Sequence, residues 1–364
     1  MSLQRFQGFE LETDTNSMLR LYGAGNFTLG SGALLNQSGA LLQGVYFKGG
    51  TGISTMNMSV APDGTFYAGI RVRARNPVNS LKLFRFLNST TEHFSLRFVT
   101  TGLGNNYRLA LFNAAGTEVS GANTGTLTGD DGAGNSPWYF VEIRGTVHDT
   151  VGTYEIRVNE TTVPGATGTA DLRNGGTTTV DRVEVNIQHL GVGSDRCDID
   201  DVVIINSLAG DRTTFAGDVA EVKAVHDSDE GAHLSATNNW TPSSGTSHFD
   251  MIDDVTPDDD ATYLTTNENE KTELFNVADL AFAAIGTPVI GVRQELMLKL
   301  LSPGTRNTQF LYKSGVTTNP SATIPFNQTT YETKERTMER DPVTNAAWTV
   351  AEINASKFGF KTVA

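Results

Sequence analysis

Short stretches in which apolar and polar residues alternate, separated by turns rich in glycine and asparagine, recur through the first 206 residues. The alternation is strongest after Thr65, where Ala68, Ile70, Val72 and Ala74 are interleaved with arginines. A period of two places successive side chains on opposite faces of a strand, whereas a helix repeats every 3.6 residues. Closely spaced strands of this kind are typical of an antiparallel β-sandwich.

The stretch from Cys197 to Asn206 indicates where the first sandwich is completed. Its uninterrupted apolar run follows a group of aspartates and predicts a central strand. The turn-prone residues Ser207 and Gly210 come next. A chain of 364 residues also exceeds the usual size of a single hydrophobic core. We therefore expect a first β-sandwich domain over residues 1–208 and a second β-rich sandwich domain, ending in a short helix, over residues 211–364.

The fold class that these patterns predict is all-β, with two antiparallel β-sandwich (jelly-roll) domains and minor short helices. The 37 glycines and the absence of long helical repeats agree with short strands joined by turns. Near the end, Thr349 and Glu352 have the spacing of a capping box, in which each side chain caps the other's backbone. We expect a helix of one or two turns to close the chain there.

Charge excludes several classes of partner. The formal net charge is −14; the 15 Lys+Arg and 19 Asp+Glu up to Leu208 give −4, and the 12 and 22 that follow give −10. Nucleic acids and anionic membranes are held by clustered basic residues, so we expect neither as a partner. The most apolar window, Val277 to Val292, is too short for membrane insertion. The single cysteine, Cys197, excludes an internal disulfide.

One strand carries a candidate interface. Arg71, Arg73 and Arg75 lie on one face of the strand that follows Thr65, opposite its apolar face. They are either a solvated face with carboxylate partners on the next strand, or a docking surface for an acidic neighbour, because arginine is enriched in interfaces.

The aspartates before the apolar run are candidate metal ligands. Hard cations such as calcium take several carboxylate and carbonyl oxygens, and Asp198, Asp200 and Asp201 offer three carboxylates. Strand alternation places Asp201 opposite the other two, which favours a different role, in which they accept backbone hydrogen bonds where the strand begins. No cofactor other than calcium is indicated.

Catalytic patterns are missing from the sequence. Glycoside hydrolysis needs two carboxyl groups beside the scissile bond, which lectin-like hydrolases commonly supply from a Glu-x-Asp-x-x-Glu strand. That pattern does not occur, nor do Gly-x-Ser-x-Gly and His-Glu-x-x-His. The sequence therefore predicts that the chain is not an enzyme.

Four segments between residues 130 and 206 resemble a known fold family when taken in order. They are Trp138-Tyr-Phe-Val-Glu-Ile, Gly152-Thr-Tyr-Glu-Ile-Arg-Val-Asn159, Asp181-Arg-Val-Glu-Val and Asp200-Asp-Val-Val-Ile204. This series resembles the concanavalin A-like, laminin G-like jelly roll. The resemblance implies two curved antiparallel sheets, and a calcium site at the rim as laminin G-like domains often have. Its members range from lectins to glycan hydrolases and structural modules, so the fold leaves the function open.

The second half resembles the C-terminal portion of structural proteins of tailed-bacteriophage virions. The resemblance is carried by Phe215-Ala-Gly-Asp-Val219, Pro257-Asp-Asp-Asp-Ala-Thr-Tyr263 and Asp341-Pro-Val-Thr-Asn-Ala-Ala-Trp-Thr349. It implies a tail-associated protein, fibre- or baseplate-like, that presents surface or adheres to the host. A capsid decoration protein and a lectin-like carbohydrate-binding module are the alternatives.

This reading has consequences for partners and localisation. We expect other virion proteins as partners, a homo-oligomer with a trimer favoured, and a host-surface glycan as a further ligand. The protein would be made in the host cytoplasm and reside in the virion.

Overall fold

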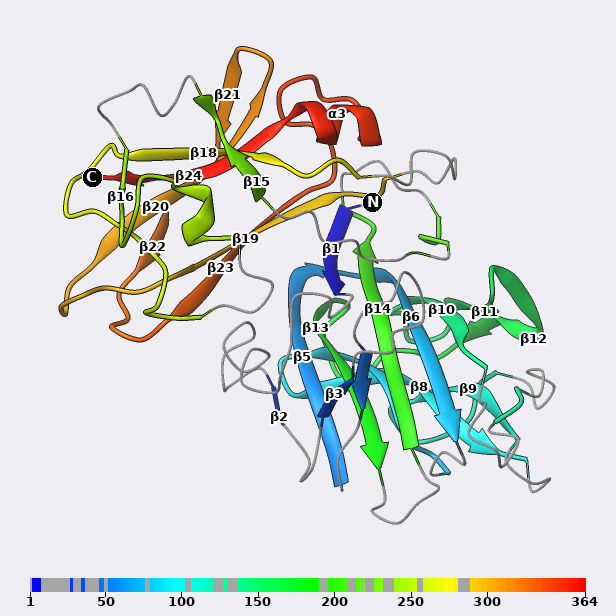
Figure 1. Cartoon of the computed structure of the whole chain (residues 1–364). Coiled ribbons are helices and arrows are strands. Elements are labelled where there is room, and N and C mark those ends of the chain that lie inside the picture. Colours follow the sequence, from blue (N-terminus) through cyan, green and yellow to red (C-terminus); the bar gives the residue numbers. More distant parts are fainter. Residues whose placement is uncertain are drawn as a thin grey trace. The chain divides into compact units, whose positions relative to one another are not determined.

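The computed structural model (Figure 1) describes residues 2–7, 27–28, 34–36, 46–48, 52–75, 79–101, 106–120, 127–129, 137–189, 196–208, 214–217, 219, 226–231, 239–253, 258–280 and 289–364. The chain forms two compact units, Met1–Val222 and Lys223–Ala364. Strands dominate both units, which confirms the all-β prediction. Among the described residues, no helix is both long and apolar enough to cross a membrane.

The first unit is built from antiparallel strands. They are β1 (Ser2–Gln7), β2 (Phe27–Thr28), β3 (Leu34–Asn36), β4 (Tyr46–Lys48), β5 (Gly52–Asp63), β6 (Thr65–Arg75), β7 (Lys82–Asn88), β8 (Thr91–Thr100), β9 (Tyr107–Asn113), β10 (Tyr139–Thr146), β11 (Gly152–Val158), β12 (Thr161–Ala170), β13 (Val180–His189) and β14 (Arg196–Asn206).

These strands form two layers. One layer has the order β12-β11-β10-β6-β14, with β1 and β4 also paired to β14; the other has the order β5-β13-β7-β8-β9. The layers are joined where β13 meets β14 at the pair His189 and Arg196. Strand β14 therefore lies between neighbours on both edges, as predicted for a central strand.

The core between the layers follows from the alternation in sequence. Ile70 and Val72 on β6 face Phe84, Phe86 and other buried side chains in one continuous apolar cluster. Burying side chains of this size contributes about 1.5–3 kcal/mol each, before the entropy of ordering them is subtracted. Because every second residue enters the core, the remaining side chains of each strand form the two outer faces of the sandwich.

The boundary between the units lies after Val222, later than the predicted one at residues 208–211. The reason is that the chain beyond Leu208 packs back onto the first unit. The Phe215 ring contacts Tyr67 edge-on at 5.1 Å and lies 4.5 Å from the Arg157 guanidinium. Gly217, at a φ of 78° that favours glycine, donates its N–H to Glu142. The turn-prone break therefore precedes a segment that still belongs to the first unit.

The described residues of the second unit form shorter strands and two short helices. They are β15 (His226–Asp229), β16 (Thr241–Pro242), η1 (Phe249–Met251), β17 (Leu264–Thr265), β18 (Thr272–Val277), β19 (Val292–Leu298), β20 (Arg306–Ser314), β21 (Thr317–Pro320), β22 (Ile324–Phe326), β23 (Glu332–Met338), α3 (Val350–Ala355) and β24 (Lys357–Val363).

A sheet with the order β15-β18-β24-β20-β21, with β22 also paired to β20, forms one side of this unit, and β19 pairs with β23. Its core gathers Tyr312, Trp348, Ile353 and Phe358. The buried Tyr312 hydroxyl donates to Asp341 at 2.8 Å, so the polar end of the ring is satisfied inside the core.

The predicted capping box is confirmed. The Thr349 hydroxyl accepts the backbone N–H of Glu352, and the Glu352 carboxylate accepts the backbone N–H of Thr349. The prediction that a helix closes the chain is wrong, because β24 follows α3. Phe358 and Phe360 bury their rings, and β24 pairs between β18 and β20.

Candidate functional site

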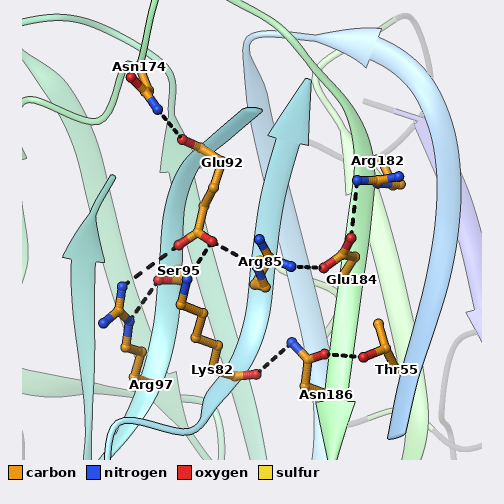
Figure 2. Close-up of polar contacts among 10 residues, drawn as sticks. All are labelled: Thr55, Lys82, Arg85, Glu92, Ser95, Arg97, Asn174, Arg182, Glu184 and Asn186. Atoms are coloured by element: carbon orange, nitrogen blue, oxygen red, sulfur yellow. Dashed lines mark hydrogen bonds and ion pairs between the residues drawn. The ribbon is translucent and has the colours of Figure 1, made fainter. Parts of the chain in front are cut away.

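The outer face of the β13-β7-β8 layer carries a group of charged side chains, which Figure 2 shows. We call it the charged face and define it by Lys82, Arg85, Glu92, Arg97, Arg182 and Glu184. The three strands are neighbours, and Glu184 lies directly across from Arg85 in the β13–β7 register. Alternation sends Arg182 and Glu184 outward from β13, whereas register shifts in the β7–β8 pair place Lys82 with Arg85, and Glu92 with Arg97, on that same outer face.

Glu92 is the centre of this group. Its carboxylate accepts hydrogen bonds from the Lys82 ammonium at 2.6 Å and from Nε of Arg85 at 2.7 Å. A guanidinium nitrogen of Arg97 lies 3.8 Å away. Arg97 is itself oriented by its Nε, which donates to Ser95 at 3.0 Å. Three cations therefore converge on one carboxylate.

Glu184 repeats the arrangement on the next strand. It accepts a hydrogen bond from Nη1 of Arg85, and Nη2 of Arg182 lies 3.1 Å from its other oxygen. Arg85 thus links both carboxylates and is shared between them. Beside it, Asn186 accepts from the Thr55 hydroxyl and donates to the carbonyl of Lys82, which ties β13 to both of its neighbours.

The acids and the cations of the charged face differ in depth. The side chains of Glu92 and Glu184 are 11% and 7% exposed, whereas those of Lys82, Arg85 and Arg182 are 35%, 28% and 30% exposed. Lys82, Arg85 and Arg182 therefore lie above the carboxylates, whereas Arg97, at 13% exposed, lies nearly as deep as Glu92. Solvent therefore meets a positively charged layer.

These contacts shift the pKa values of side chains in the charged face. Burial by itself raises the pKa of Glu92, but hydrogen bonds from Lys82 and Arg85 outweigh it, so the pKa lies below its ordinary value. Burial alone lowers the pKa of Arg85, yet its bonds to both glutamates leave that pKa raised. Burial lowers the pKa of Arg97. Glu92 and Arg85 therefore hold each other in the charged form.

The arginines and aspartates selected from the sequence meet on the other layer of the same unit. Strand β14 pairs with β6, so that Asp198 lies across from Arg73 and Asp200 across from Arg71. Arg73 donates to Asp198 through Nε and Nη2, at 3.1 and 3.0 Å. Residues of the two predicted sites therefore meet across the β6–β14 pair, where Arg73 and Asp198 form an ion pair.

A β-bulge in β14 brings Asp201 into this set. The pairing with β6 shifts between Asp200 and Val203, and Asp201 has a φ of 48°. The bulge turns the Asp201 carboxylate to the face of Arg71, where it accepts from Nε at 2.9 Å. Strict alternation had predicted the opposite face, and the extra residue of the bulge is why that prediction was wrong.

The arginine stripe is not an open docking surface at Arg71, which is only 5% exposed. Its guanidinium lies 5.5 Å from the Phe140 ring and donates to the carbonyl of Val219, so the chain's own segment covers it. Arg73 is partly exposed and lies 4.7 Å from the Trp138 ring. Arg75 ends β6 and pairs with Arg196. Arg71 and Arg73 therefore serve the internal packing of the first unit.

The predicted calcium ligands are engaged by cations of the chain. Asp198 and Asp201 bind arginines, and an Asp200 oxygen accepts the backbone N–H of Asp201 at 2.9 Å. Within the described ranges, no three His, Cys, Asp or Glu side chains are placed to hold a metal ion together. The calcium site expected at Asp198, Asp200 and Asp201 stays a prediction, and in the described structure these carboxylates serve the chain's own contacts.

A second buried polar group lies in the second unit. Nδ1 of His248 is 3.0 Å from both oxygens of Glu273, and the backbone N–H of Trp240 donates to the same carboxylate. The backbone N–H of His248 in turn donates to the Asp229 carboxylate at 3.0 Å. These bonds attach the segment before η1 to β15 and β18, which is a structural use of the imidazole.

The sequence analysis missed the charged face. Part of its signal was present, because Arg182 and Glu184 lie two residues apart on the polar side of their strand. Lys82 and Arg85 are three residues apart and share a face only because the β7–β8 register shifts after Lys82. What the sequence cannot supply is the register between β13, β7 and β8, which decides that these side chains meet.

No family model matches the chain, and no curated protein matches it. Among solved structures, a protein titled "Sialidase" is 10% identical, with a TM-score of 0.36, over 57% of this chain and 19% of that one. "Cellulose induced protein, Cip1" is 13% identical with a TM-score of 0.40, over 59% of this chain and 100% of that one. Domain 4 of an extracellular arabinanase from Geobacillus stearothermophilus, in complex with arabinotriose, is 13% identical with a TM-score of 0.34. It is matched over 56% of this chain and 91% of the domain.

The expectation that the chain is not an enzyme is contradicted by the sialidases among these structures, and we do not retain it. The chain spans about a fifth of the length of the first of them, with 19% covered. At such identities and TM-scores the likeness assigns no activity to this chain.

Proposed function

We propose that the protein is a tail-associated component of a tailed-bacteriophage virion, which presents β-sandwich surface to a neighbouring subunit or to the host. The virion-type phrases of its second half support this role, as does the two-unit all-β architecture.

The observation that carries the proposal is the construction of the charged face. Long cationic side chains are flexible when isolated, and ordering them on contact costs about 0.5–1.5 kcal/mol each. Here Arg85 is fixed by two carboxylates, and Lys82 and Arg97 are held by Glu92. A sheet face whose charges are ordered in advance is suited to adhesion.

The test is to locate the protein in purified particles. Mass spectrometry of gradient-purified phage, followed by immunogold electron microscopy, should find the chain on the tail. Light scattering after size exclusion should give a homo-oligomer, for which we favour a trimer. Gold on the capsid would instead identify a decoration protein. Particles without the chain would rule out a structural role in the virion.

A lectin-like module is the second candidate, and the same charged face favours it. Sugar recognition would use its polar side chains, since Trp348 is buried and Trp240 packs edge-on against Phe360. A soluble protein that binds saccharides but is absent from particles would support this candidate.

A further inference from the structure

We infer that the charged face binds an anionic glycan, meaning a saccharide chain that carries carboxylate or sulfate groups. The inference rests on the adhesive role proposed above and names the class of ligand and the residues that receive it.

The first step concerns the excess of positive over negative side chains on the charged face, and how deeply each kind is buried. The face combines four cations with two carboxylates, and the carboxylates are the less exposed groups. The protein as a whole has a charge of −14, so this positive layer departs from the rest of the chain. A negatively charged ligand would be attracted to it, and guanidinium groups bind carboxylate or sulfate oxygens through paired N–H donors.

The second step is the spacing of the cations. Arg182, Arg85 and Arg97 lie on three consecutive strands, β13, β7 and β8. Neighbouring strands are about 4.8 Å apart, so the cations extend over roughly 10 Å across the sheet. A ligand with several negative charges along its length fits such a row better than a single small anion.

The third step excludes a protein partner as the favoured ligand. Protein interfaces of stable complexes have an apolar, desolvated centre. The exposed large apolar side chains among the described residues are Val151, Leu208, Tyr263, Leu301 and Val316, and none lies on β7, β8 or β13. The charged face lacks that centre.

The fourth step separates glycans from nucleic acids. Proteins that bind single strands offer aromatic rings on which bases stack. Beside the cations lies the Phe112 ring, and the Arg97 guanidinium is placed over it at 4.4 Å. A base cannot stack on a ring face that a guanidinium occupies.

The test compares two variants of the full-length protein. The first, Lys82→Gln/Arg182→Gln, removes the two most exposed cations and leaves the bond between Arg85 and Glu92 in place. The control, Lys299→Gln/Lys361→Gln, removes two cations of the second unit that are also paired with acids, Asp260 and Glu270. Both changes lower the net charge equally.

Binding is measured by calorimetry with a heparin oligosaccharide, an oligogalacturonate, neutral dextran and a single-stranded DNA of equal charge. We expect the wild type to bind a sulfated or carboxylated saccharide and not dextran, and the first two probes show which group it prefers. The charged-face variant should bind about tenfold more weakly, since it loses two charge-assisted contacts. The control variant should change affinity less than about twofold, because its surface pairs lie elsewhere.

The inference would be overturned if the two variants lost affinity equally, if neither anionic saccharide bound, or if DNA bound equally tightly. Circular dichroism verifies folding, and Arg182→Gln alone serves if the double variant unfolds, because Arg182 pairs only with Glu184 in the charged face as described. A protein that fails here but is still found in particles would leave the proposed virion role intact.

Discussion

Asp201 adopts a left-handed backbone conformation, with a φ of 48°, and its carboxylate accepts a hydrogen bond from Nε of Arg71 at 2.9 Å. Both side chains are almost completely buried, at 2% and 6% exposure. An aspartate tolerates this conformation better than most residues. The bulge and the ion pair therefore depend on each other, because the turn of the backbone is what aims the carboxylate at the arginine.

We predict that Arg71→Met destabilises the first unit by about 3–5 kcal/mol, because it leaves Asp201 buried without its cation. The double variant Arg71→Met/Asp201→Asn should be less destabilised than the sum of the single variants. Hydrogen exchange of the β6 and β14 amides in urea measures the loss of stability of the first unit alone. Additive effects would show that the pair is not coupled.

Glu92 should make stability depend on pH in the acidic range. Its pKa in the folded protein is below the ordinary value of 4.5, so its stabilising contribution is complete above that pH and is lost as the pH falls through the folded pKa. Denaturant titrations at pH 6 and pH 3 should therefore show the wild type losing more stability than Glu92→Gln. A parallel loss in both proteins would contradict this.

His93 should act in a higher pH range. The side chain is buried; its Nδ1 accepts the N–H of Asn174, and Nε2 lies 3.1 Å from the carbonyl of Thr179. Burial lowers the pKa of His93 below 6.5, although the bond to Thr179 opposes it. The neutral ring thus stabilises the fold above pH 6.5, and that contribution is lost as the pH falls.

The melting temperature of the first unit should therefore fall between pH 7 and pH 5 in the wild type. It should fall less in His93→Gln. His148→Gln provides the matched control, since it replaces a histidine whose side chain is 47% exposed. An unchanged slope in His93→Gln would assign the pH dependence to other groups.

The capping box of α3 provides a test in the second unit. Thr349→Ala removes the acceptor for the Glu352 N–H and should cost about 1 kcal/mol. Hydrogen exchange of α3 amides should speed up accordingly, while the exposed-loop change Thr330→Ala should leave it unaltered. Equal protection in both variants would mean that packing of Ile353 alone holds the helix.

Local patterns predicted the elements better than their contacts. Alternation around Ile70 and Val72 correctly predicted a buried strand, and the spacing of Thr349 and Glu352 correctly predicted a helix start. The partners of Arg71 could not be predicted, because they depend on a bulge and on a register between strands more than a hundred residues apart. The charged face was missed for the same reason.

The return of Phe215 and Gly217 to the first unit has a practical consequence for anyone who transplants that unit into another polypeptide. A graft that stops at Leu208 would remove the segment that covers the ring of Tyr67 and the guanidinium of Arg71. The hydrophobic surface exposed in this way would promote aggregation. A graft that continues through Val222 retains the segment that covers both side chains.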